Sequence, residues 1–117
     1  SLFAGDRVIR DFSARADDNR AVLEWTSGIE TDLKSYDVQR SFDGSQFNDI
    51  AHVNPAGDNH EYRYIDNDLF KGNVSTYYYR ISALFNDNSR YDSEVKKITV
   101  SSSGIHRTWG SIKAMFR

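Results

Sequence analysis

The stretch that decides the fold reads Tyr77-Tyr78-Tyr79-Arg80-Ile81-Ser82-Ala83. Its apolar side chains alternate: Tyr77, Tyr79, Ile81 and Ala83 fall on one side, and Tyr78, Arg80 and Ser82 fall on the other. A period of two in aromatic and β-branched residues predicts a strand with one buried face. Leu69 and Gly72 precede this strand. A leucine, a turn and then a tyrosine suggest a tyrosine corner, in which the buried Tyr77 hydroxyl bonds back to upstream backbone.

Further strands are predicted on both sides of this one. They cover residues 8–16, 21–26, 36–40, 47–53, 62–66 and 94–100. Turn signals separate them, notably Asp17-Asp18-Asn19 and the hairpin dipeptide Asp43-Gly44. The side chains expected to point inward are Val8, Phe12, Ala14, Ala21, Leu23 and Trp25. Seven strands with turns about every 8 to 12 residues predict an all-β, antiparallel, seven-stranded sandwich.

Composition limits the classes of function. The 117 residues allow one domain with one core, and the net charge of −2 gives no reason to expect nucleic acid as a partner. The chain has no cysteine, which excludes disulfides and thiolate metal sites. No run of about 18 apolar residues exists, so no membrane span is expected. The chain begins at Ser1, and whether this is a mature N-terminus or a boundary introduced by cloning stays open.

Several of these segments together resemble a known family. They are Leu23-x-Trp25, Tyr36-x-Val38, Leu69 ahead of Tyr77-x-Tyr79-x-Ile81-x-Ala83, and Arg40-Ser41-Phe42-Asp43-Gly44. The chain from about residue 7 to 100 resembles a fibronectin type III domain, which is an immunoglobulin-like sandwich. The sequence of these segments is similar to that of modules in large secreted or cell-surface bacterial proteins, notably those of Bacteroidetes. The resemblance therefore implies an extracellular or cell-surface module, although the gap from Leu69 to Tyr77 is longer than is usual in the family.

The C-terminal segment differs from the rest of the chain. We divide the sequence into a lead-in (1–6), the sandwich (7–100), a linker (101–104) and a docking tail (105–117). The tail combines large apolar groups with three basic residues and no acidic residue. Its expected contact residues are Ile105, Arg107, Trp109, Ile112, Lys113, Met115 and Phe116. A solvated linker rarely holds so many large apolar groups, so we expect the tail to be covered by its own sandwich, by another subunit or, less favourably, by a membrane surface.

The sequence gives little support for catalysis. His52, His60 and His106 are scattered, and neither a phosphate-binding glycine loop nor a paired-histidine metal motif is present. A nucleophile needs a base within hydrogen-bond reach, and nothing in the sequence predicts such a pair. We therefore expect no enzyme, no cofactor and no dedicated metal site.

Two weaker site candidates remain. Acidic residues are expected in loops at one end of the sandwich, where they could offer oxygen ligands to calcium, although aspartate is also an ordinary turn residue. These candidates are Asp17, Asp18, Asp43, Asp66 and Asp68. Outward tyrosines, with Tyr78 and Tyr91 as the candidates, could form a platform for sugar rings.

The sequence thus favours a non-catalytic extracellular structural or interaction module. The tail suggests head-to-tail assembly with copies of itself or within a larger surface assembly. The alternative is an accessory carbohydrate-binding module of a secreted protein, with polysaccharide as its partner.

Overall fold

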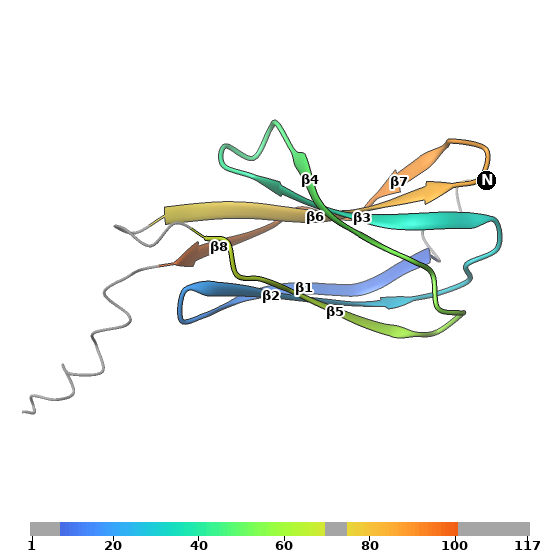
Figure 1. Ribbon diagram of the computed structural model, residues 1–117, viewed down its shortest axis with the longest axis horizontal. Helices are drawn as coiled ribbons and strands as arrows, with labels where there is room; N and C mark the ends of the chain where they lie inside the picture. Colours follow the sequence, from blue (N-terminus) through green and yellow to red (C-terminus); the bar gives the residue numbers. More distant parts are fainter. Residues whose placement is uncertain (1–7, 70–74, 101–117) are drawn as a thin grey trace, which may run out of the picture.

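The computed structural model describes residues 8–69 and 75–100 and confirms the all-β antiparallel sandwich (Figure 1). This part of the chain forms eight strands, one more than the sequence predicts. They are β1 (Ile9–Asp17), β2 (Arg20–Ser27), β3 (Leu33–Ser41), β4 (Asn48–Val53), β5 (Glu61–Asp66), β6 (Ser75–Phe85), β7 (Arg90–Asp92) and β8 (Lys96–Val100). The lead-in, the linker and the docking tail predicted from the sequence lie outside the described residues.

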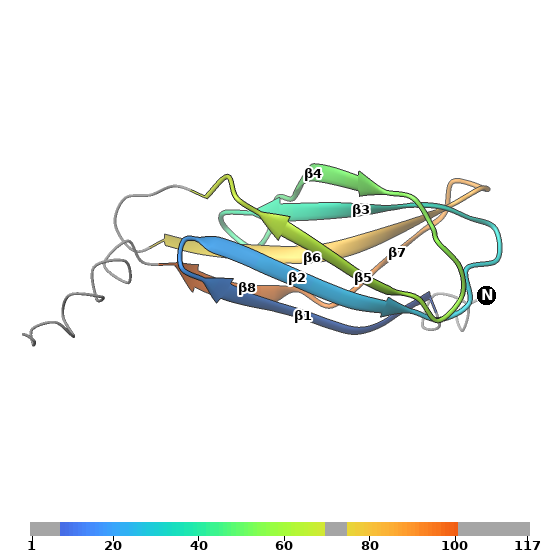
Figure 2. The same cartoon turned by 60° about the horizontal axis from the view of Figure 1, so that its bottom comes forward.

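The strands form two layers, which Figures 1 and 2 show from two directions. One sheet has the order β1-β2-β5, and the other has the order β4-β3-β6-β7 with β8 also paired to β6. All the pairings are antiparallel. No helix in this part of the chain is long and apolar enough to cross a bilayer.

The additional strand is β7, which the sequence analysis missed. Both β7 and β8 pair with β6: β7 pairs with Ser82–Leu84 and β8 with Ser75–Tyr79. Ser93 bridges the break between them, because its amide bonds the Ile81 carbonyl at 2.8 Å and its Oγ accepts the Ile81 amide at 2.9 Å. Three residues are too few to show a period of two, so β7 left no clear sequence signal.

The core lies between the sheets and is rich in aromatic rings. Trp25 stacks on Tyr62 with ring centroids 5.1 Å apart and meets the edge of Tyr36 at 5.6 Å. The predicted inward faces are confirmed: Tyr77, Tyr79, Ile81 and Ala83 are buried, as are Val8, Phe12, Ala21, Leu23 and Trp25, while Ala14 is partly buried against them. The Trp25 indole N–H has no hydrogen-bond partner among the described residues.

A buried carboxylate joins the two sheets at one end of the sandwich. Asp66, on β5, accepts hydrogen bonds from the Arg40 guanidinium at 2.8 Å and from the Tyr79 hydroxyl at 2.7 Å. Burial and the adjacent Asp66 carboxylate both raise the pKa of Tyr79, so the phenol stays protonated. The three groups therefore form a satisfied polar contact inside an otherwise apolar layer.

A second carboxylate does the same at the opposite end. Glu30 lies in the β2–β3 loop and accepts hydrogen bonds from the hydroxyls of Tyr36 on β3 and Tyr62 on β5. Its other oxygen accepts the Gly57 amide at 2.7 Å. Burial, followed by the bond to Glu30, raises the pKa of Tyr62 to about 12. At each end of the sandwich a carboxylate thus accepts hydrogen bonds from tyrosine on the core side: one hydroxyl at Asp66 and two at Glu30.

The predicted hairpin at Asp43-Gly44 is present between β3 and β4. Gly44 has a φ of +81°, which side-chain-bearing residues rarely adopt. The Asp43 carboxylate accepts the amides of Ser45 and Gln46 at 2.8 and 2.9 Å. The tyrosine corner stays a prediction: Tyr77 is buried, but Gly72 and the rest of its turn lie outside the described residues.

Candidate functional site

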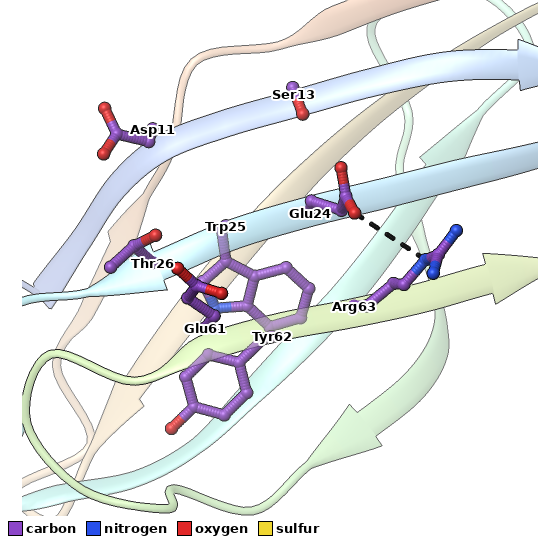
Figure 3. A pocket seen from close by; sticks show the side chains of 8 residues that line it. All are labelled: Asp11, Ser13, Glu24, Trp25, Thr26, Glu61, Tyr62 and Arg63. Carbon is purple, nitrogen blue, oxygen red and sulfur yellow. Dashed lines mark ion pairs between the residues drawn. The ribbon is translucent and has the colours of Figure 1, made fainter.

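The outward faces of the two sheets carry different polar surfaces. On the five-stranded sheet we define the network face as Asp37, Gln39, Asp49, His52, Arg80, Ser82, Arg90 and Asp92. On the three-stranded sheet a surface depression of about 490 Å³ is lined mainly by polar residues (Figure 3). We define the groove as its outward side chains, Asp11, Ser13, Glu24, Thr26, Glu61 and Arg63.

Asp37 is the centre of the network face. It lies on β3, and 2% of its surface is exposed. One oxygen bonds the His52 Nδ1 at 2.6 Å, and the other accepts the Arg90 guanidinium at 2.9 Å. Arg90 also donates to the Ser82 hydroxyl at 3.0 Å. A buried aspartate on an outward face is unusual, and here His52 and Arg90 each bond one of its oxygens.

These contacts shift the proton equilibria in opposite directions. Burial alone would raise the pKa of Asp37, but the hydrogen bonds from His52 and Arg90 hold it below its ordinary value. The Asp37 carboxylate in turn raises the pKa of His52 by accepting its hydrogen bond. The pair therefore favours the charged form of both residues.

A second chain of contacts continues across the network face. The Gln39 amide donates to Asp49 at 2.7 Å and accepts the Arg80 Nε at 2.7 Å. Arg80 also lies 3.6 Å from Asp92 and places its guanidinium 4.2 Å from the centroid of the Phe47 ring. Each polar side chain here already has a protein partner.

A β-bulge places Asp49 and His52 on the same side of edge strand β4. The register shifts between Val38 and Gln39, so that one extra β4 residue stands against β3. The resulting group of Asp37, Asp49 and His52 has potential metal-ligand atoms within 4.8 Å of one another. Arg90 and Gln39 already donate to its two carboxylates, so a bound cation would compete with these donors.

The groove has the opposite character. Its side chains stand in two cross-strand rows. Ser13 pairs with Glu24 and Glu24 with Arg63 in one row, and Thr26 pairs with Glu61 in the other, where Arg10 precedes Thr26. The Glu24 carboxylate and Arg63 Nε are 3.7 Å apart, and both side chains are about half exposed. The side chains of Asp11, Ser13, Thr26 and Glu61 make no hydrogen bond or ion pair with the described residues. The buried residues Trp25 and Tyr62 complete the lining.

The backbone is irregular at one edge of the groove. The pairing of β1 with β2 shifts between Arg10 and Ser13, so Asp11 and Phe12 together stand opposite Trp25. Asp11 has a φ of 54°, a left-handed conformation that is uncommon outside glycine. Bulges redirect side chains, and this one lets Phe12 remain in the core while Asp11 lies at the groove.

The described residues contain no recognisable catalytic set. Among them, the side chain that bonds the His52 ring is Asp37, and no hydroxyl bonds its other nitrogen. The His60 ring packs edge-on against Tyr62 at 4.7 Å. His106 lies outside the described residues.

Of the calcium candidates, Asp17 and Asp66 are the last residues of β1 and β5, the others lie in the connections that follow strands, and three of the five carboxylates have other partners. Asp17 pairs with Arg20 at 2.6 Å, Asp43 caps its own turn, and Asp66 is held by Arg40 and Tyr79. Asp18 and Asp68 are exposed. None of these five carboxylates belongs to the potential metal-ligand group found among the described residues.

The structure does not bring the two candidate tyrosines together. Tyr78 alternates with the buried Tyr77 and Tyr79 and lies outward, with its ring against Gly44. Tyr91 pairs with the inward residue Ala83 and is partly buried against the core. The rings are on opposite faces of the five-stranded sheet, so they cannot form one flat platform.

The predicted tail contacts lie outside the described residues and stay predictions. Sequence reasoning missed both surfaces described above. The members of the network come from β3, β4, β6 and β7, and Asp37 and Arg90 are 53 residues apart. One local signal of the network face was present in the sequence. Gln39, Asp49 and His52 are polar residues within predicted strands that otherwise carry apolar residues.

No protein-family model and no curated protein sequence matches the chain. Solved structures do match. An Fn3-like protein from Clostridium thermocellum is 26% identical with a TM-score of 0.58, and the alignment covers 77% of this chain and 88% of that one. The pectate lyase Pel3 from Pectobacterium carotovorum is 23% identical with a TM-score of 0.58, over 74% of this chain and 26% of the lyase.

A β-1,2-glucanase from Parabacteroides distasonis matches 82% of this chain at 21% identity and a TM-score of 0.50. The matched part is 12% of the glucanase. Thus this chain corresponds to a small part of each enzyme and to most of the Clostridium protein. Together with the strand order and the aromatic core, these similarities show that the chain has a fibronectin type III-like fold.

Proposed function

We propose that this chain is a non-catalytic, carbohydrate-associated interaction module of an extracellular or cell-surface protein. One observation carries the proposal: a part with the same fold is found in a pectate lyase and in a β-1,2-glucanase, where it makes up 26% and 12% of the enzyme chain. A domain of this kind beside a catalytic domain can hold the protein on a polysaccharide. The groove offers polar groups for binding, and the described residues contain no recognisable pair of a nucleophile and its base.

The experiment is affinity electrophoresis of the full chain in gels that contain β-1,2-glucan, β-1,3-glucan, hydroxyethylcellulose or polygalacturonate. We expect slower migration in at least one polysaccharide gel than in a gel without polysaccharide. We also expect no release of reducing sugar and no unsaturated product from these polymers. Unchanged migration in all four gels would contradict the proposed association, and polymer cleavage would contradict the non-catalytic role.

A second candidate is self-assembly through the docking tail. It is favoured by the position of β8, which ends at Val100 at the same end of the sandwich as the acidic loops (Figure 1). β1 begins at the opposite end of the sandwich, so a tail that follows β8 in one copy could dock near the start of β1 in the next copy, as head-to-tail assembly requires. Light scattering on the full chain and on residues 1–103 tests this: assembly predicts a larger mass for the full chain alone, and equal masses contradict it.

A further inference from the structure

We propose that the groove on β1, β2 and β5 is a binding site for an uncharged polysaccharide strand. This inference rests on the proposed carbohydrate association and names the face that carries it. The starting observation is the difference between the two polar surfaces. The network face uses its donors and acceptors internally, whereas Asp11, Ser13, Thr26 and Glu61 offer theirs to solvent or to a ligand.

The arrangement of these groups suits an extended polymer. The Ser13–Glu24–Arg63 row and the Thr26–Glu61 row each run across neighbouring strands. Residues two apart on a strand are about 7 Å apart, so the rows form two parallel lines of polar groups. A polymer lying across the strands can therefore meet several of these groups in succession within the depression of about 490 Å³.

The chemical groups suit hydroxyl-bearing ligands. Carboxylates accept hydrogen bonds, the guanidinium donates them, and Ser13 and Thr26 can do both. Sugar hydroxyls also donate and accept, so each ring could satisfy groups from either row. A protein partner fits less well, because the centres of protein interfaces are depleted in acidic residues and enriched in aromatic ones.

Charge restricts the ligand further. The groove carries three carboxylates, Asp11, Glu24 and Glu61, against Arg63 within it and Arg10 beside Thr26 at its edge, so negative charge remains in excess. This excess of negative charge repels a polyuronate and leaves an uncharged glycan as the better ligand. We therefore expect the groove to bind an uncharged glycan better than an acidic polymer such as polygalacturonate.

The backbone determines where the Asp11 side chain lies. Asp11 keeps a left-handed conformation with a φ of 54° at the bulge. Here the bulge places the Asp11 carboxylate at the end of the rows.

The test compares groove variants with a matched control in affinity gels containing β-1,2-glucan, hydroxyethylcellulose or polygalacturonate. Glu61→Gln removes one charge while keeping the side-chain shape, and the double variant Glu61→Ala/Thr26→Val removes both groove side chains of one row. Glu94→Gln is the control, because Glu94 is an exposed glutamate between β7 and β8. Circular dichroism is used to check that each variant is folded.

We expect the full chain to bind an uncharged glucan in preference to polygalacturonate. The double variant should weaken that binding by about tenfold or more, Glu61→Gln by less, and Glu94→Gln not at all. Retention of the double variant equal to that of the wild type would overturn the groove assignment while leaving carbohydrate association intact. Preference for polygalacturonate would overturn the charge argument. Absence of retention for the wild type on every polymer would overturn the association itself.

Discussion

The two outward faces of this sandwich use similar polar residues in different ways. On the network face, Asp37 is buried beneath His52 and Arg90, and the donors and acceptors are paired across four strands. In the groove, four polar side chains have no partner among the described residues, and the Glu24–Arg63 pair is loose at 3.7 Å. Paired groups stabilise the fold but are not free to bind. Unpaired groups contribute little to stability and remain available to a ligand.

The largest expected effect comes from the core that supports both faces. Trp25→Ala should lower the free energy of unfolding by about 3–5 kcal/mol, because it removes a buried ring stacked on Tyr62 and leaves a cavity. Trp25→Phe is the control and should cost less, since the indole N–H has no partner to lose among the described residues. Urea unfolding measures both. A loss below about 1 kcal/mol for Trp25→Ala would contradict its place in the core.

The next effect separates the two faces. Asp37→Ala removes the buried acceptor of His52 and Arg90, and we expect a loss of about 1–3 kcal/mol, moderated because both partners can turn to water. Asp92→Ala, on the same sheet, is a control in which an exposed carboxylate 3.6 Å from Arg80 is lost. It should change stability by less than about 1 kcal/mol. Equal losses for the two variants would show that Asp37 has no central role.

The network face also predicts a pH dependence. The pKa of His52 is raised in the folded state by its bond to Asp37, so its stabilising contribution is present below about pH 6.5 and is lost as pH rises through the folded pKa. Urea unfolding between pH 5.5 and 8.5, values chosen to bracket this range, should show that His52→Gln flattens the decline seen in the wild type. His60→Gln is the control and should leave the decline in place. Identical pH profiles for wild type and His52→Gln would contradict the pairing.

The smallest expected effect on stability lies in the groove. Glu61→Gln and Ser13→Ala should change the free energy of unfolding by no more than about 0.5 kcal/mol, because neither side chain has a partner among the described residues. Urea unfolding of these variants beside Asp37→Ala sharpens the comparison directly. A loss above about 1 kcal/mol in either groove variant would mean that the groove contributes to the fold in the way that the network does.

The sequence predicted the sandwich well because burial leaves a local pattern. The alternation from Tyr77 to Ala83 and the inward set around Trp25 were correct residue by residue. The short strand β7 was missed, since three residues carry no period. The alternation of β6 was also interpreted too simply: Ser82 does face outward, yet it is buried beneath Arg90.

The site was much harder to predict than the fold. The bulges at Asp11 and in β4 shift register by one residue, and a simple alternation cannot show where such a shift occurs. Tyr91 was expected to face outward beside Tyr78, but its pairing with Ala83 places it on the inward side. Whether a polar residue is paired depends on partners from distant strands, as between Asp37 and Arg90, and local sequence does not encode that.

The most direct test of the account is an amide chemical-shift titration of the full chain with an uncharged glucan that retards it. We predict shift changes that cluster on the amides of Asp11, Ser13, Thr26 and Glu61, with little change at Asp37, His52 and Arg90. That result would establish the groove as the binding face and the network as a structural one. Changes centred on the network face, or no changes on the three-stranded sheet, would contradict the division of roles between the two faces.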